Sequence, residues 1–253
     1  MTGAGEEQRR RIDGVLFDYG ETLVEFSRPH QALADAEQRI LALVAASGRT
    51  APSPTTLRAV FDRVDREVAE HQRSGALEEM DLAASALRAY GDSGVRLDDA
   101  LLDEVLRIEQ EAWWLGAHLD PEAIPLLESL RSGGIRVGLC SNAPYRVRSL
   151  HAQLAFLGLD GHLDSATFSA EVGWRKPSPR IFEAAMRALG TVTARTVMVG
   201  DTETADIAGA HAAGMRVVLL DRSGDRGSSE ADAVISALRA LPGALRNMGI
   251  YLD

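Results

Sequence analysis

Short apolar segments recur in the second half of this chain and once near its beginning. Most of them are apolar at nearly every position rather than at every second position. A continuous apolar run of this length is typical of a strand buried on both faces, as in a parallel sheet. The segments expected to be strands are 14–17, 135–140, 165–168, 196–199 and 216–220.

Helical patterns separate these strands from residue 120 onward. Apolar residues at spacings of three and four predict helices that begin near Pro121 and cover about 145–157, 178–190 and 204–213. Ser178-Pro179 is a favoured pair at a helix start, and Gly190 is a favoured residue just past a helix end. Strands that alternate with helices predict an α/β fold, a Rossmann-like, doubly wound parallel sheet.

Residues 29–116 follow a different pattern. Four amphipathic helices succeed one another there with no strand between them, and 57–68 shows the apolar stripe most clearly. One apolar face on each helix suits a small bundle. Because one core strand precedes this block and the others follow it, we expect an α/β core of residues 1–25 and 118–253 with an inserted helical cap of residues 26–117.

Composition and charge exclude several classes of partner. The hydrophobic share of 45% is ordinary for a globular protein, while the net charge of −10 disfavours binding to nucleic acid or to anionic lipid. The polar start, 1–11, has no apolar stretch after it, so we do not interpret it as a signal peptide. Cys140 is the only cysteine, which fits a reducing, cytoplasmic location. We expect a monomer or a homodimer without nucleic-acid or membrane partners.

One lysine, Lys176, stands against 26 arginines. The two residue types are nearly equivalent on a solvated surface, but only lysine offers a compact, strongly hydrated point charge. A lysine retained in such a background is therefore a candidate for a role that guanidinium cannot fill.

Polar residues follow the predicted strands at the edge where parallel sheets bind ligands. Asp18 follows the first strand, Ser141-Asn142 the second, and Asp201 and Asp206 the fourth. Three carboxylates at one edge repel one another unless a cation neutralises them, and Mg²⁺ is a natural ligand for such a set. Any one of these residues could simply be a polar strand end, but the set in register with several strands favours a phosphate site with Mg²⁺ as its cofactor.

The motifs at these positions resemble those of the haloacid dehalogenase superfamily. Asp18-x-x-x-Thr22, Ser141-Asn142, Lys176-Pro-x-Pro and Gly200-Asp201-Thr-x-x-x-Asp206 are similar to its four motifs in order and spacing. The helical insertion is similar in position to the C1 cap of that superfamily. The resemblance implies a hydrolase, most simply a phosphatase that acts on a small phosphorylated metabolite.

Carried over to this chain, the resemblance implies a nucleophile and a metal site. Asp18 would attack phosphorus and form an aspartyl-phosphate that water then hydrolyses. The Asp18 carboxylate, the Gly20 main-chain carbonyl and Asp201 would bind Mg²⁺. Asp206 would be a further ligand, either directly or by holding a direct one.

The same resemblance implies a set of phosphate-binding groups. Thr22, Ser141 and Asn142, the last through its backbone N–H, would hold the phosphoryl oxygens. Lys176 would orient Asp18 and neutralise charge. Positioned cations should contribute most because phosphoryl transfer depends chiefly on charge stabilisation.

Gly20 departs from the phosphatase pattern. Phosphatases of the superfamily usually have a second Asp at this position, which protonates the leaving group, and a general acid is typically worth about 10²- to 10⁴-fold in rate. The leaving group could need little protonation, as in an acyl or anomeric phosphate. Alternatively, Glu21 or Glu25 could substitute, or hydrolysis could be slow or absent in a phosphate-binding relic.

Two other functions therefore remain open. A metal-free 2-haloacid dehalogenase also lacks the second Asp, although retention of Asp201 and Asp206 favours phosphate chemistry. A catalytically silent phosphate-binding or interaction protein is the other alternative. Trp113-Trp114 is expected to be a core or hinge pair, with substrate contact as the less favoured interpretation, and Trp174 is expected near the pocket mouth. No pattern in the cap identifies the substrate.

Overall fold

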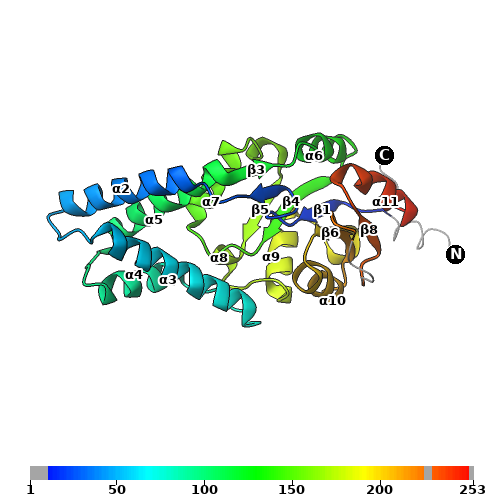
Figure 1. Ribbon diagram of the computed structural model, residues 1–253. Helices are drawn as coiled ribbons and strands as arrows, with labels where there is room; N and C mark the ends of the chain where they lie inside the picture. The colour runs from blue at the N-terminus through cyan, green and yellow to red at the C-terminus, as the bar shows by residue number, and fades with distance from the viewer. Residues whose placement is uncertain (1–10, 225–229, 251–253) are drawn as a thin grey trace.

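A six-stranded parallel sheet forms the centre of the computed structural model, which describes residues 11–224 and 230–250 (Figure 1). Its strands lie in the order β5-β4-β1-β6-β7-β8. Their bounds are β1 Gly14–Phe17, β4 Arg136–Ser141, β5 Ser165–Phe168, β6 Thr196–Gly200, β7 Arg216–Leu220 and β8 Ala233–Ile235. The α/β class and the parallel sheet expected from the apolar runs are confirmed.

Alternate residues of each strand pack into two separate apolar clusters, one on each face of the sheet. Val15 and Phe17 face the cluster that contains α6 (Ala123–Ser132), α7 (Val147–Phe156) and α11 (Leu241–Asn247). Leu16 faces the opposite cluster. That cluster contains α9 (Pro179–Leu189) and α10 (Gly209–Ala212). Burial on both faces explains why the strands are apolar throughout.

Four helices form a second unit with an apolar cluster of its own. They are α2 (His30–Ala46), α3 (Pro54–Arg73), α4 (Leu82–Asp92) and α5 (Asp99–Trp113), seen at the left of Figure 1. Side chains of Ser53, Asp81 and Asp98 accept hydrogen bonds from backbone N–H groups in the first turns of α3, α4 and α5. These caps satisfy donors that the helix itself leaves free and so fix where each helix begins.

A two-stranded antiparallel ribbon marks where the chain leaves the sheet and returns to it. It consists of β2 (Val24–Phe26) and β3 (Ala117–Leu119). This ribbon lies close to the boundaries 26 and 117 expected from the sequence. The division into core and cap remains a proposal, and the part of it that concerns residues 1–10 and 251–253 lies outside the described residues.

Several elements differ from the sequence-based expectations. β2, β3 and β8 are three residues long, too short to give a recognisable pattern. The helix expected over 204–213 begins as a π-helix, Glu203–Ala208, and continues as α10. A segment near Gly173 adds a short helix, α8 (Ser169–Val172). Within the described residues, no helix is long and apolar enough to cross a membrane.

Candidate active site

The strand order brings three of the predicted site residues to one place. β1 lies between β4 and β6, so Asp18, Ser141 and Asp201 follow or end neighbouring strands at the same edge. The backbone N–H of Asp18 donates to the carbonyl of Val199 at 2.9 Å, which extends the β1–β6 pairing to the residue that carries the carboxylate. The connections from β1 diverge to its two sides, which is where open α/β sheets bind ligands.

Lys176 lies between two of the carboxylates. Its Nζ donates to Asp18 Oδ1 at 2.5 Å and to Asp206 Oδ1 at 2.6 Å, and its side chain is only 2% exposed. Burial alone would lower the pKa of Lys176, but the charges of Asp18 and Asp206 outweigh it and raise that pKa above its usual value. The ammonium is therefore charged wherever the fold is intact.

Negative charge still exceeds positive charge at this point. Burial raises the pKa of the Asp18 carboxyl and the charge of Asp206 adds to this, while Lys176 opposes both. Ligand oxygens of Asp18, Asp201 and Asp206 all lie within 4.8 Å of one another. Three carboxylates and one ammonium leave an excess charge that a divalent, oxygen-preferring cation would neutralise.

Both carboxylate oxygens of Asp206 already have protein partners. Oδ1 accepts from Lys176, and Oδ2 accepts from the backbone N–H of Thr202 at 2.9 Å. A Cβ at Gly200 would overlap this carboxylate, so the close approach requires glycine there. The geometry suits Asp206 to holding Lys176 and the loop after β6 in place.

The Asn142 side chain binds the backbone of Lys176 at both hydrogen-bonding groups. Its Nδ2 donates to the Lys176 carbonyl at 3.0 Å, and its Oδ1 accepts from the Lys176 N–H at 2.7 Å. The sequence motif indicates only a backbone role for Asn142. The side chain thus couples the end of β4 to the segment that carries the lysine.

Ser141 and Thr22 are also placed at this edge. Ser141 ends β4 and is buried, and Thr22 is fully buried with no partner for its Oγ1 among the described residues. An unpaired buried hydroxyl is costly, so Thr22 has a donor available for a bound oxyanion.

A sequence model of one family, described as haloacid dehalogenase-like hydrolase, matches residues 12–214. The chain belongs to this hydrolase family. The match spans the helical insertion, most of the sheet and every residue discussed above. The family resemblance expected from the four motifs is confirmed.

Two related sequences are named phosphatases. A glyceraldehyde 3-phosphate phosphatase of Methanopyrus kandleri is 30% identical over 83% of this chain and 84% of its own. A ribulose-1,5-bisphosphate 5-phosphatase of Halopiger xanaduensis is 36% identical over 51% of this chain, and the chain spans about half of that relative, 53%. Among solved structures, a 2-haloacid dehalogenase of Pseudomonas syringae is 27% identical with a TM-score of 0.67, covering 93% of this chain and 99% of that one.

Gly20, where this hydrolase departs from the phosphatase motif, is not forced by crowding. A Cβ at Gly20 would lie 3.6 Å from the nearest atom, in the Phe26 ring, which is an ordinary contact. The next residue, Glu21, adopts a left-handed backbone with φ of 58°. Glu21 and Glu25 are both exposed, and neither belongs to the carboxylate group of Asp18, Asp201 and Asp206.

The cap of this hydrolase is tied to the loop that carries Lys176. Glu78 pairs with Trp174 in an antiparallel bridge, flanked by hydrogen bonds from Glu79 N–H to the Gly173 carbonyl and from Arg175 N–H to the Leu77 carbonyl. The buried Glu79 carboxylate accepts from Ser169 Oγ at 2.5 Å. Ser169 Oγ in turn accepts from the Ala143 N–H. No sequence pattern indicates this tie because the paired segments are short and almost a hundred residues apart.

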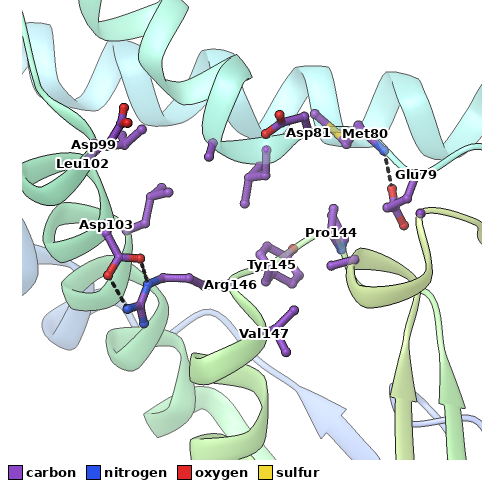
Figure 2. A pocket seen from close by; sticks show the side chains of 15 residues that line it. Glu79, Met80, Asp81, Asp99, Leu102, Asp103, Pro144, Tyr145, Arg146 and Val147 are labelled. Atoms are coloured by element: carbon purple, nitrogen blue, oxygen red, sulfur yellow. Dashed lines mark hydrogen bonds and ion pairs between the residues drawn. The ribbon is translucent and has the colours of Figure 1, made fainter.

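Two cavities lie between the cap and the core. The larger, of about 530 Å³, is shown in Figure 2, where Arg146 from the loop before α7 forms an ion pair with Asp103 of α5. None of the residues expected at the active site lines it. The smaller cavity, of about 320 Å³, is lined by Gly20, Ser141 and Asn142. The smaller cavity therefore adjoins the candidate active site.

The tryptophans lie elsewhere than expected. Trp113 and Trp114 line the smaller cavity, so the less favoured interpretation, substrate contact, fits them better than a core or hinge pair. Trp174 lines neither cavity. Its ring stacks on the guanidinium of Arg180 at 3.8 Å, an intramolecular cation–π contact.

Proposed function

We propose that this hydrolase is a Mg²⁺-dependent phosphatase that acts on a small phosphorylated metabolite. The observation that carries the proposal is the buried cluster in which Lys176 bridges Asp18 and Asp206, with Asp201 beside them. The named phosphatases among its relatives support the same reaction class.

The residues present fit a hard divalent cation. Asp18, the Gly20 carbonyl and Asp201 would hold Mg²⁺, and Asp206 would hold Lys176 and the loop of Asp201 in position. When bound, the ion supplies positive charge to the phosphoryl oxygens and keeps the carboxylates ionised.

In the proposed reaction the second carboxylate oxygen of Asp18 attacks phosphorus. The bond between phosphorus and the leaving oxygen breaks, and the electron pair leaves with that oxygen. Lys176 holds the nucleophile in one orientation and offsets the charge, while Ser141, Thr22 and the Asn142 N–H bind phosphoryl oxygens. Water then cleaves the aspartyl-phosphate and restores Asp18, so the net reaction consumes one water and gives alcohol and phosphate.

The helical unit 26–117 would serve as a cap over the core of 1–25 and 118–253. The tie between Glu79 and Ser169 and the two cavities at the junction support this division. Closure would exclude water from the aspartyl-phosphate until the leaving group departs. A cytoplasmic location and a monomeric or homodimeric state remain predictions.

A metal-free 2-haloacid dehalogenase is the second candidate. The similarity to the Pseudomonas syringae enzyme and the absence of a side chain at Gly20 favour it. Asp attack on carbon, however, gains nothing from two further carboxylates beside the nucleophile. The cluster therefore supports phosphate chemistry more strongly.

An assay with two substrate classes distinguishes the candidates. Phosphate monoesters, acetyl phosphate and 2-haloacids are incubated with Mg²⁺ or with EDTA, and Asp18→Asn serves as the blank. Phosphate release that requires Mg²⁺ and is lost in the blank is the expected result. Halide release untouched by EDTA would establish the dehalogenase, and Mg²⁺-dependent binding of vanadate without turnover would establish a silent module.

Mg²⁺ binding has a readout that does not depend on activity. We expect Mg²⁺ at 100 times its Kd to stabilise the fold by about 2.7 kcal/mol. For a chain of this size that corresponds to a rise of several degrees, roughly 2–4 °C per kcal/mol, in the melting temperature. Differential scanning fluorimetry of Asp201→Asn should show little of this rise. An equal rise in both proteins would place the ion elsewhere.

A further inference from the structure

Aromatic side chains gather around the smaller cavity. Five of its 13 lining residues are aromatic, whereas aromatic residues make up only 5% of the chain. They are Tyr19, Phe26, Trp113, Trp114 and Tyr145. These rings come from the loop after β1, from β2, from the end of the cap and from the loop after β4. Such a concentration of flat surfaces suits a flat, apolar ligand.

Charge is absent from the lining of this cavity. None of the described residues that line it is Asp, Glu, Lys or Arg. A second phosphate, a carboxylate or an ammonium on the substrate would lose its hydration there without gaining a counter-charge. The part of the substrate that leaves is therefore expected to be neutral.

One polar group in the lining lacks a partner. Gln110 is 9% exposed, and its Nε2 has no hydrogen-bond partner among the described residues. Its Oε1 accepts from the backbone N–H of Arg146 at 3.2 Å, which fixes the amide and leaves the NH₂ group available. A buried donor without an acceptor is costly, so the ligand is expected to carry an acceptor.

Gly20 lines the same cavity and offers no proton donor for a leaving oxygen. Without a general acid, the leaving group must depart as an anion, which is feasible for an aryl oxygen with a pKa of about 10 and much slower for an alkanol. Aromatic lining and the missing acid are independent observations that agree on one chemistry.

We propose that the substrate is the phosphate ester of a neutral aromatic hydroxy compound with a hydrogen-bond acceptor on its ring. The inference rests on the proposed phosphatase function. The bond between phosphorus and the aryl oxygen breaks as Asp18 attacks, the phenolate leaves with the electron pair and takes a proton from water, and a second water releases phosphate from Asp18.

Four substrates separate ring binding from leaving-group chemistry. Phenyl phosphate has the ring and the good leaving group, benzyl phosphate has the ring with an alkanol, acetyl phosphate has a good leaving group without the ring, and glycerol 3-phosphate has neither. With Mg²⁺ and the full chain, we expect kcat for phenyl phosphate to exceed that for benzyl phosphate about 100-fold. We expect the KM of glycerol 3-phosphate to exceed that of benzyl phosphate at least about tenfold.

Three variants test the named residues. Gly20→Asp should raise kcat for benzyl phosphate at least about tenfold and change phenyl phosphate little, because the added acid matters only for the poor leaving group. Tyr145→Ala should raise the KM of phenyl phosphate about three- to tenfold without affecting acetyl phosphate. Gln110→Ala should weaken the binding of para-acetylphenyl phosphate, which carries an acceptor on its ring, more than the binding of phenyl phosphate. Leu115→Ala is the matched control, since Leu115 is 64% exposed and lines neither cavity.

The outcomes separate the two proposals. No phosphate release from any ester, acetyl phosphate included, would contradict the phosphatase function itself. Turnover of glycerol 3-phosphate with a kcat/KM equal to or above that of phenyl phosphate would leave the phosphatase intact and overturn the aromatic substrate. Melting temperatures of the variants show whether a lost activity reflects a lost fold.

Discussion

Lys176 binds two carboxylates through one nitrogen. The Nζ distances of 2.5 and 2.6 Å and the 2% exposure of the side chain describe a space filled by a single ammonium. A guanidinium is planar and larger and presents its donors in a fixed fork. Retaining the positive charge is therefore not enough to retain the geometry.

We accordingly predict that Lys176→Arg lowers kcat at least about 100-fold although the charge is kept, the size of effect expected when one positioned donor is lost. Phosphate release under saturating Mg²⁺ is the measurement, with circular dichroism to confirm folding. Arg187→Lys, an exposed exchange of the same two residue types on α9, should remain near the activity of the unmodified protein. Near-normal turnover by Lys176→Arg would remove the argument for a point charge.

Helix α5 carries a carboxyl group with an unusual environment. Burial raises the pKa of Glu109 to about 8, the nearby charge of Asp65 adds to the rise, and Arg28 opposes it. The neutral acid is thus favoured in the folded state. Its contribution to stability is complete below the ordinary value of 4.5 and is lost as the pH rises toward 8.

Glu109→Gln should remove this dependence because the amide stays neutral. We expect the variant to be more stable than the unmodified protein by about 1–2 kcal/mol at pH 9, with little difference at pH 4.5, since each unit of pKa shift corresponds to about 1.4 kcal/mol. Urea unfolding followed by tryptophan fluorescence at the two pH values measures it. Parallel pH profiles for both proteins would show that Glu109 ionises normally. Glu111→Gln on the same helix is the control.

The molecule as a whole shows which features a sequence pattern reveals. Apolar runs predict β1 and β6 because burial on both faces leaves a local trace, and the motifs at their ends locate Asp18 and Asp201. Contacts between distant segments leave no such trace. The Asn142 side chain on the Lys176 backbone, the bridge between Glu78 and Trp174, and the aromatic lining from separate elements appear only once the chain is folded.

The contact between cap and core leads to a prediction about the molecule as a whole. The Glu79 carboxylate accepts from Ser169 Oγ, and Ser169 also accepts from the N–H of Ala143, directly after Asn142. Removing the carboxylate in Glu79→Ala leaves the buried Ser169 hydroxyl without its acceptor, at a cost of about 1–3 kcal/mol. The bridge beside it, which closes the cap onto the Lys176 segment, should then open more often.

Hydrogen exchange of the amides of Glu79 and Arg175, which donate across this bridge, measures the opening directly. We expect faster exchange at both amides in Glu79→Ala and a KM raised severalfold, because a cap that closes less often captures substrate less often. Glu70→Ala, exposed on α3, should change neither. Unchanged exchange at both amides in Glu79→Ala would mean that the backbone bridge alone holds the cap, and the side-chain tie would then have no part in closing the site.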